Sequence, residues 1–200
     1  MSITVETLTG SVLEKALPAL ARLRITVFRD WPYLYEGSLD YEESYIAGFA
    51  ASEDSVIVAA RDGDEIVGAA TAAPLRGHTD SFVPLFVAHG FNPDTIFYFG
   101  ESVLLPAYRG RGIGHAFFDW RENHARKVSG QKAAYTRSAF CGVVRPQDHP
   151  LRPKDYRPLD AFWIKRGYHK VDGMVGSLTW KDIDEPEATP KPMQFWMKLL

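Results

Sequence analysis

A glycine-rich run, Arg109-Gly110-Arg111-Gly112-Ile113-Gly114, stands between a segment typical of a strand and a segment typical of a helix. Before it, residues 96–105 are rich in aromatic and β-branched side chains, and Pro106 ends that pattern. After it, apolar side chains recur every three or four residues along 113–128, which predicts a helix with one buried face. Glycines at a helix N-terminus let the backbone approach a ligand, and the free N–H groups there favour an anion. The junction therefore predicts a phosphate-binding site.

The spacing of the glycines distinguishes between kinds of phosphate-binding loop. A Walker loop needs Lys followed by Ser or Thr after its last glycine, and neither pair follows here. A dinucleotide fingerprint starting at Gly110 would need a glycine at position 115, which is His115, and no βαβ unit is evident before it. The remaining pattern is Arg-x-x-Gly-x-Gly. A plain turn between strand and helix, with both arginines in solvent, is the alternative without a ligand.

The run from Val103 to Gly114 resembles the acetyl-CoA-binding motif of the GNAT superfamily of N-acetyltransferases. The resemblance implies that backbone N–H groups from Gly110 to His115 bind the CoA pyrophosphate and that two arginines add positive potential. It also implies that this strand and the next one splay apart and that the pantetheine arm bonds to the backbone between them. The residues so implied in CoA binding are Val103, Leu104, Leu105, Arg109, Gly110, Arg111, Gly112, Ile113, Gly114 and His115. The side chains of 103–105 are equally well explained as sheet core.

The order of predicted elements is similar to the GNAT fold over nearly the whole chain. Strands are predicted at 3–8, 55–60, 66–73, 96–105, 133–144, 175–180 and 193–199, and helices at 12–28, 41–49, 113–128 and 161–166. The segment 77–92 is predicted as a short helix or packed loop, and 182–192 as a polar loop. Residues 100–102 predict a local irregularity in their strand. We expect a single α/β domain over residues 1–200, with a mixed, mainly antiparallel central sheet flanked by helices.

Composition narrows the partners and the compartment. With 46% hydrophobic residues, a chain of 200 residues can bury one substantial core. A net charge of −2 argues against nucleic-acid binding, which usually needs a basic surface. Cys141 is the single cysteine, which excludes an internal disulfide and a multi-cysteine zinc site, and no metal is expected. Without a visible secretory signal or membrane span, we expect a cytoplasmic monomer or homodimer with no membrane partner.

Glu101 is the candidate base for the acetyl transfer that the resemblance implies. A base near the thioester must take a proton from the attacking amine, and burial in an aromatic strand would make this carboxylate more basic. A solvent-facing carboxylate at a bulge is the alternative. His149 and Tyr156 are further candidates. Family members often carry a tyrosine as the acid in the segment that reads Phe162-Trp163-Ile164-Lys165-Arg166-Gly167-Tyr168 here, but Trp163 takes its place.

The amine acceptor, a small molecule or a peptide, is expected to bind beside aromatic side chains after the first predicted helix. Trp31, Tyr33 and Tyr35 are the candidate substrate-binding residues, and nearby acidic residues would attract a cationic amine. Packing of these aromatics onto the core is the alternative. Arg145 and neighbouring basic residues predict a loop that serves the CoA 3′-phosphate, an anionic acceptor, or only solubility.

Two mechanisms and two functions follow from these residues. Direct attack of the amine on acetyl-CoA in a ternary complex is expected. In the alternative mechanism Cys141 is a nucleophile that carries the acetyl group covalently, whereas direct attack leaves Cys141 as a small core residue. The predicted function is therefore an acetyl-CoA-dependent N-acetyltransferase. The alternative is a non-catalytic acyl-CoA-binding or regulatory domain of the same fold.

Overall fold

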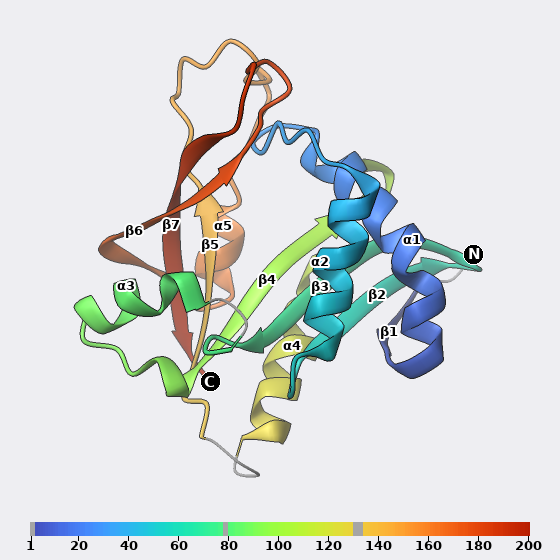
Figure 1. Ribbon diagram of the computed structural model, residues 1–200, viewed down its shortest axis with the longest axis vertical. Coiled ribbons are helices and arrows are strands. Elements are labelled where there is room, and N and C mark those ends of the chain that lie inside the picture. The colour runs from blue at the N-terminus through green and yellow to red at the C-terminus, as the bar shows by residue number, and fades with distance from the viewer. Residues whose placement is uncertain (1–2, 78–79, 130–133) are drawn as a thin grey trace.

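The computed structural model describes residues 3–77, 80–129 and 134–200. Its strands are β1 (Ile3–Leu8), β2 (Val56–Asp62), β3 (Glu65–Pro74), β4 (Ile96–Leu104), β5 (Arg137–Val143), β6 (His169–Trp180) and β7 (Thr189–Leu199). Its helices are α1 (Gly10–Phe28), α2 (Leu39–Ala51), α3 (Val83–Ala88), α4 (Ile113–Val128) and α5 (Asp160–Lys165). The strands form one seven-stranded sheet in the order β1-β2-β3-β4-β5-β7-β6 (Figure 1). Every neighbouring pair is antiparallel except β4 and β5, which confirms the mixed, mainly antiparallel α/β fold.

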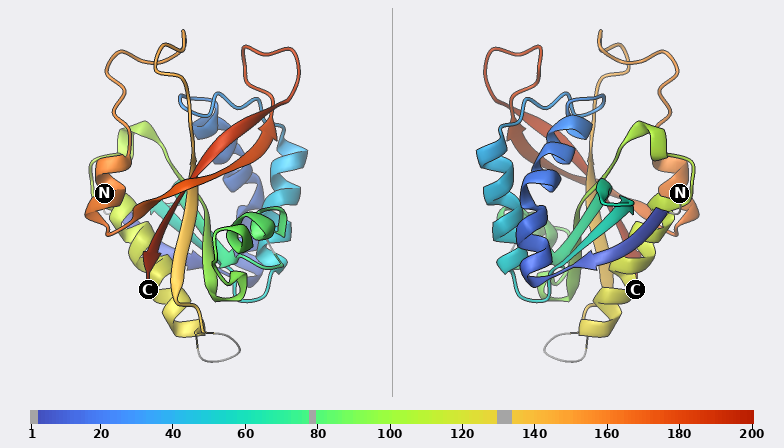
Figure 2. Two further views of the ribbon diagram at one scale, coloured as in Figure 1. Left: turned by 90° about the vertical axis from the view of Figure 1, so that its left-hand side faces the viewer. Right: turned by 90° about the vertical axis from the view of Figure 1, so that its right-hand side faces the viewer.

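Helices cover both faces of the sheet, as the two side views in Figure 2 show. One face of β2 and β3 packs with α1 and α2 in a buried cluster, and the other face packs with α4 in a second cluster. Because both faces of these strands are buried, their sequences are almost continuously apolar. A third cluster places Phe82 and Phe86, before and within α3, against Phe195 of β7.

The predicted ends of three strands are wrong. β5 begins at Arg137, whereas its predicted start, Ala133, lies outside the described residues. β6 begins at His169 and not at 175, because its pairing with β7 is interrupted between Lys170 and Val175, where Gly173 has a φ of 70°. β7 extends back to Thr189, so the predicted polar loop is shorter. Within 77–92 the described part holds a 3₁₀ turn and α3, and 78–79 lie outside it.

β4 and β5 pair over a short distance only. The pairs run from Ile96 with Arg137 to Tyr98 with Ala139, although both strands continue beyond that point. The register of β4 with β3 also shifts. Ala70 is paired with Ser102 and Ala72 with Phe99, so β4 has one extra residue between these two pairs. This β-bulge confirms the predicted irregularity. Past it, the edge of β4 that faces β5 lacks a paired strand, which opens a gap inside the sheet.

Candidate active site

A groove of about 2150 Å³ occupies the gap between the diverging ends of β4 and β5. The glycine-rich loop before α4 lies at one part of its wall, and the aromatic segment after α1 lies at another. Residues of β4, β5, α2, α4, β6 and β7 and of the segment 151–163 also line the groove. The groove therefore joins the predicted phosphate-binding residues to the predicted acceptor-binding residues.

The N-terminus of α4 presents free backbone N–H groups to this groove. Gly110 and Gly112 have φ values of 76° and 83°, a region that residues with a side chain rarely adopt. Gly112 is the N-cap, and the first backbone bond of the helix runs from the N–H of Ala116 to its carbonyl. The N–H groups of Ile113, Gly114 and His115 therefore have no partner within the helix. An anion would be favoured there by these donors and by the helix dipole.

The two arginines of the loop lie differently. Both are exposed, but only Arg109 lines the groove, and its Nε lies 3.4 Å from the carbonyl oxygen of Leu104. Arg111 donates to the carbonyl of Ala107 at 3.0 Å and lies over the ring of Tyr108, outside the groove. Arg109 is thus the better placed of the two to add positive potential.

The backbone of β4 presents alternate residues to the gap. The N–H of Leu105 donates to the carbonyl of Val67 at 3.0 Å and is therefore already paired with β3. Val103 lies opposite Ala69 two residues earlier in the same register, so its backbone N–H and carbonyl also point toward β3. The backbone groups of Ser102 and Leu104 therefore point to the gap. Of the predicted run 103–105, Leu104 is the residue whose backbone points to the gap, where its carbonyl accepts the bond from Arg109, and Ser102 was not predicted as a site residue.

Glu101 lies in a buried charged cluster. Its Oε1 is 2.5 Å from Nη1 of Arg24, and its Oε2 accepts a hydrogen bond of 3.2 Å from the hydroxyl of Tyr45. Arg24 also donates from Nε to Glu42, which is fully buried. With 9% of its surface exposed, Glu101 is not a solvent-facing carboxylate. One guanidinium against two carboxylates leaves a formal charge of −1 in this cluster.

Arg24 and Glu42 were not predicted as site residues. Arg24 follows Leu20 by four positions on the buried face of α1. A charged residue at an apolar position of a predicted helix was the feature of the sequence that could have revealed it. Burial by itself lowers the pKa of Arg24, but the carboxylates of Glu101 and Glu42 raise that pKa above its usual value overall. The arginine is held charged between its two partners.

All three predicted aromatic residues line the groove. The ring of Trp31 lies 5.0 Å from that of His149 and 5.9 Å from that of Tyr156, and of these two residues Tyr156 also lines the groove. Tyr33 packs on Phe28 at 4.7 Å. Burial, together with a hydrogen bond to Glu42 in the case of Tyr35, raises the pKa of Tyr33 and of Tyr35 above its usual value. These tyrosines are neutral donors at physiological pH.

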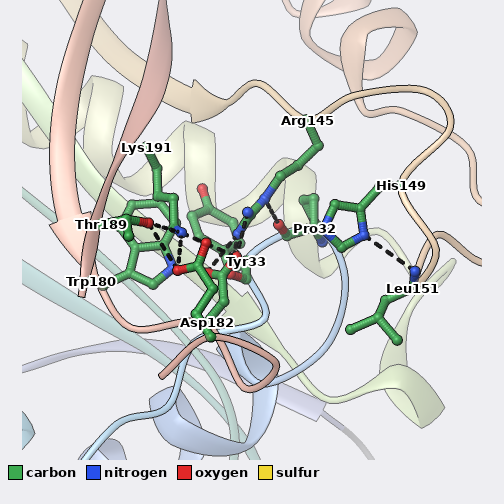
Figure 3. A network of polar contacts seen from close by, with 10 residues as sticks. Pro32, Tyr33, Arg145, His149, Leu151, Trp180, Asp182, Thr189 and Lys191 are labelled. Atoms are coloured by element: carbon green, nitrogen blue, oxygen red, sulfur yellow. Dashed lines mark hydrogen bonds and ion pairs between the residues drawn. The ribbon is translucent and has the colours of Figure 1, made fainter. Parts of the chain in front are cut away.

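Arg145 holds the aromatic segment in place. Figure 3 shows its guanidinium between the carboxylate of Asp182 and the backbone of Pro32 and Tyr33. The bonds to these carbonyls measure 2.7 and 2.6 Å, and those to the carboxylate 2.5 and 2.9 Å. Lys191 completes the network at 3.3 Å from Asp182. The donors of Arg145 are therefore used within the protein, so of the basic residues in the predicted loop Arg145 is not free to contact a phosphate or an anionic acceptor.

The Acetyltransferase (GNAT) family model matches residues 20–145. The chain belongs to the GNAT family of acetyltransferases. No curated protein matches its sequence. Ribosomal-protein-alanine N-acetyltransferase from Brucella melitensis has a similar structure, with a TM-score of 0.62 and 14% identity over 98% of this chain and 99% of that one. An acetyltransferase from Streptococcus agalactiae gives a TM-score of 0.61 and 14% identity over 99% and 98%.

A further similar structure was solved with its cofactor, acetyl-CoA. It is the yncA protein of Salmonella typhimurium, with a TM-score of 0.61 and 10% identity over 100% of this chain and 95% of that one. At these identities the structures agree in fold. Over the described ranges of the present GNAT domain, no group of three or more His, Cys, Asp or Glu side chains could hold a metal ion. None of the helices described is long and apolar enough to cross a membrane.

Two residues in the GNAT groove bear on the mechanism. Cys141 is buried, its Sγ is 3.1 Å from the hydroxyl oxygen of Tyr98, and burial raises its pKa to about 12. Trp163 of α5 packs on Phe140 and Trp196, with its ring so close to Gly142 that an added Cβ would lie 3.1 Å away. Neither an ionisable acid at 163 nor a thiolate at 141 is present at neutral pH.

Proposed function

We propose that this GNAT protein transfers the acetyl group of acetyl-CoA to a primary amine by direct attack in a ternary complex. The divergence of β4 and β5 beyond Tyr98 carries the proposal, because it opens a groove from the N-terminus of α4 to the cluster around Glu101. The N–H groups at 110–115 would bind the pyrophosphate, assisted by Arg109. The pantetheine arm would then bond to the backbone of Ser102 and Leu104 and bring the thioester to the bulge.

The cluster around Glu101 suits a cationic amine. Its formal charge of −1 lies beside the aromatic wall that includes Trp31, Tyr33 and Tyr35. A buried negative charge favours binding of an ammonium, and aromatic faces add cation–π attraction. The bound ammonium would first lose one proton to solvent to become the attacking amine, and Glu101 would then take the second proton from the attacking nitrogen, directly or through water. The acceptor is a small molecule or a peptide.

Direct transfer is favoured over an acetylated enzyme because of Cys141. The thiolate, and not the thiol, is the nucleophile, and a thiol with a pKa of about 12 is almost entirely protonated at neutral pH. Its hydroxyl neighbour Tyr98 is also buried, and burial raises the pKa of that phenol as well. Neither group can serve as a base for the other. The predicted cytoplasmic location and the monomeric or homodimeric state stay predictions.

Calorimetry with acetyl-CoA and CoA tests the binding step. At a hundredfold excess over its Kd, a ligand that binds only the native state adds about 2.7 kcal/mol to the unfolding free energy. Gly112→Asp places a negative charge at the pyrophosphate site and is expected to abolish binding. Gly90→Asp is the matched control, since Gly90 has a φ of 76°, open space at its Cβ position, and no part in the groove. A folded Gly112→Asp variant that binds CoA normally would remove the proposed phosphate site.

Turnover separates the enzyme from a non-catalytic acyl-CoA-binding or regulatory domain. Release of CoA with acetylated product is expected for at least one member of a panel of polyamines, amino acid amines and peptide N-termini. Tight acetyl-CoA binding with only slow hydrolysis across the whole panel would favour the binding domain.

A further inference from the structure

Arg121 connects α4 to the bulge of β4. Its side chain is 1% exposed, and its Nη1 donates to the carbonyls of Thr71 and Glu101 at 3.3 and 3.1 Å. Its Nε donates to the carbonyl of Phe117 at 3.0 Å, and its Nη2 donates to Oγ of Ser102 at 2.8 Å. The guanidinium thus holds both strands at the point where the register shifts.

All four of these acceptors are neutral oxygens. Within the described part of the chain, no carboxylate forms an ion pair with Arg121. The guanidinium lies 4.4 Å from the ring centre of Phe99 and 4.9 Å from that of Phe118. Burial lowers its pKa to about 10, so it remains charged at neutral pH. A buried positive charge without an ion-pair partner among the described residues therefore lies behind the bulge, and the carboxylates of Glu101 and Glu122 are near enough to favour its charged form.

Ser102 is the contact between this charge and the groove. It is exposed and lines the groove, and it lies on the α4 side of β4, whereas Glu101 contacts Arg24 on the α1 side. Its Oγ accepts from Arg121, so its own hydrogen is available to a different acceptor. Among the described residues no acceptor receives that hydrogen bond. A hydroxyl that accepts from a guanidinium is also a stronger donor than an isolated one.

We propose that Ser102 donates a hydrogen bond to the CoA sulfur as the thioester breaks, and that Arg121 is the positioning residue that holds and polarises it. This proposal rests on the proposed acetyl transfer. The amine nitrogen forms a bond to the carbonyl carbon, the C–S bond breaks, and its electron pair passes to sulfur. The proton of the amine goes to Glu101, while Ser102 keeps its own proton. The thiolate leaves, stabilised by the hydroxyl and by the charge behind it, and takes a proton from water after release.

The titration of the CoA thiol in its complex with the enzyme tests this role without an acceptor. Ultraviolet absorbance follows the thiolate as the pH rises. In Ser102→Ala the bound thiol is expected to titrate about one pH unit higher than in the parent, which corresponds to tenfold weaker thiolate stabilisation. With the acceptor present, kcat is expected to fall up to ~10-fold with little change in KM for acetyl-CoA, because the transition-state sulfur carries no more charge than the thiolate. Ser102→Thr, which keeps the hydroxyl, is expected to restore both.

Ser177→Ala is the matched control, because Ser177 is an exposed serine on β6 that does not line the groove. Arg121→Lys keeps the charge but loses the planar fork, so it is expected to move the thiol titration in the same direction as Ser102→Ala. An unchanged titration in Arg121→Lys would overturn the role of Arg121. Normal CoA binding with an unchanged titration and kcat in Ser102→Ala would overturn the role of Ser102. A parent protein that does not bind CoA would instead overturn the proposed function.

Discussion

Replacing Arg24 by methionine removes the positive charge from the cluster that holds Glu101. The Arg24 side chain is 10% exposed, and it lies between the carboxylates of Glu42, at 0%, and Glu101, at 6%. Methionine keeps most of the length of the side chain but lacks the guanidinium, which lies over the rings of Tyr45 and Phe28. The variant therefore loses charge far more than volume, and it leaves two carboxylates buried without a counter-charge.

The expected loss of stability is large. Two opposite charges about 4 Å apart attract by about 4 kcal/mol at an effective dielectric constant of 20. Arg24 makes two such contacts, and breaking a buried ion pair costs about 3–5 kcal/mol after the site relaxes. For a chain of this size, each kcal/mol lowers Tm by about 2–4 °C. Arg24→Met is thus expected to melt roughly 6–20 °C below the parent.

Urea denaturation followed by tryptophan fluorescence measures this loss. Arg22→Met, at an exposed position of the same helix, is the control and is expected to change the unfolding free energy by less than ~0.5 kcal/mol. When Glu42→Gln is combined with Arg24→Met, one of the two unpaired charges is removed, and the double variant is expected to recover part of the lost unfolding free energy. If Arg24→Met is as stable as Arg22→Met, or if Glu42→Gln recovers nothing, the charged cluster does not determine the stability of this site.

Two further predictions concern the chemistry. Glu101→Gln keeps size but removes basicity, so kcat is expected to fall ~10²-fold or more with CoA affinity little changed; an unchanged kcat and pH profile in steady-state kinetics would exclude Glu101 as the base. Burial raises the pKa of Cys141 to about 12, so iodoacetamide is expected to alkylate the native protein very slowly at pH 8, and Cys141→Ala is expected to stay active. The pKa of this thiol is higher in the native state than in the unfolded chain, where it is about 8.5. Burial of the neutral thiol therefore contributes fully to the unfolding free energy below that pH, and the contribution is lost as the pH rises toward 12. Rapid alkylation of the native protein, or an inactive but folded Cys141→Ala variant with ping-pong kinetics in the parent, would contradict this account.

The elements around the anion site could be predicted from the sequence because their causes are local. Glycines with positive φ, the proline after β4 and the apolar periodicity of 113–128 act within a few residues of one another. The irregularity in β4 was predictable for the same reason, since a glycine and two polar residues interrupt an aromatic run. Where a strand is itself interrupted, as β6 is near Gly173, the local pattern breaks and its predicted start was wrong.

The amino-acid sequence by itself thus determined the α/β elements, the glycine-rich helix N-terminus and the position of Glu101 on the strand before it. Only the tertiary structure decided which charges meet there. Arg24 and Glu42 approach Glu101 from two helices, and Arg121 approaches the same bulge from a third on the opposite face. Such pairs have no sequence period, because their members lie on separate elements that come together only when the helices pack on the strand. Burial then requires each charged or polar group to find a partner there.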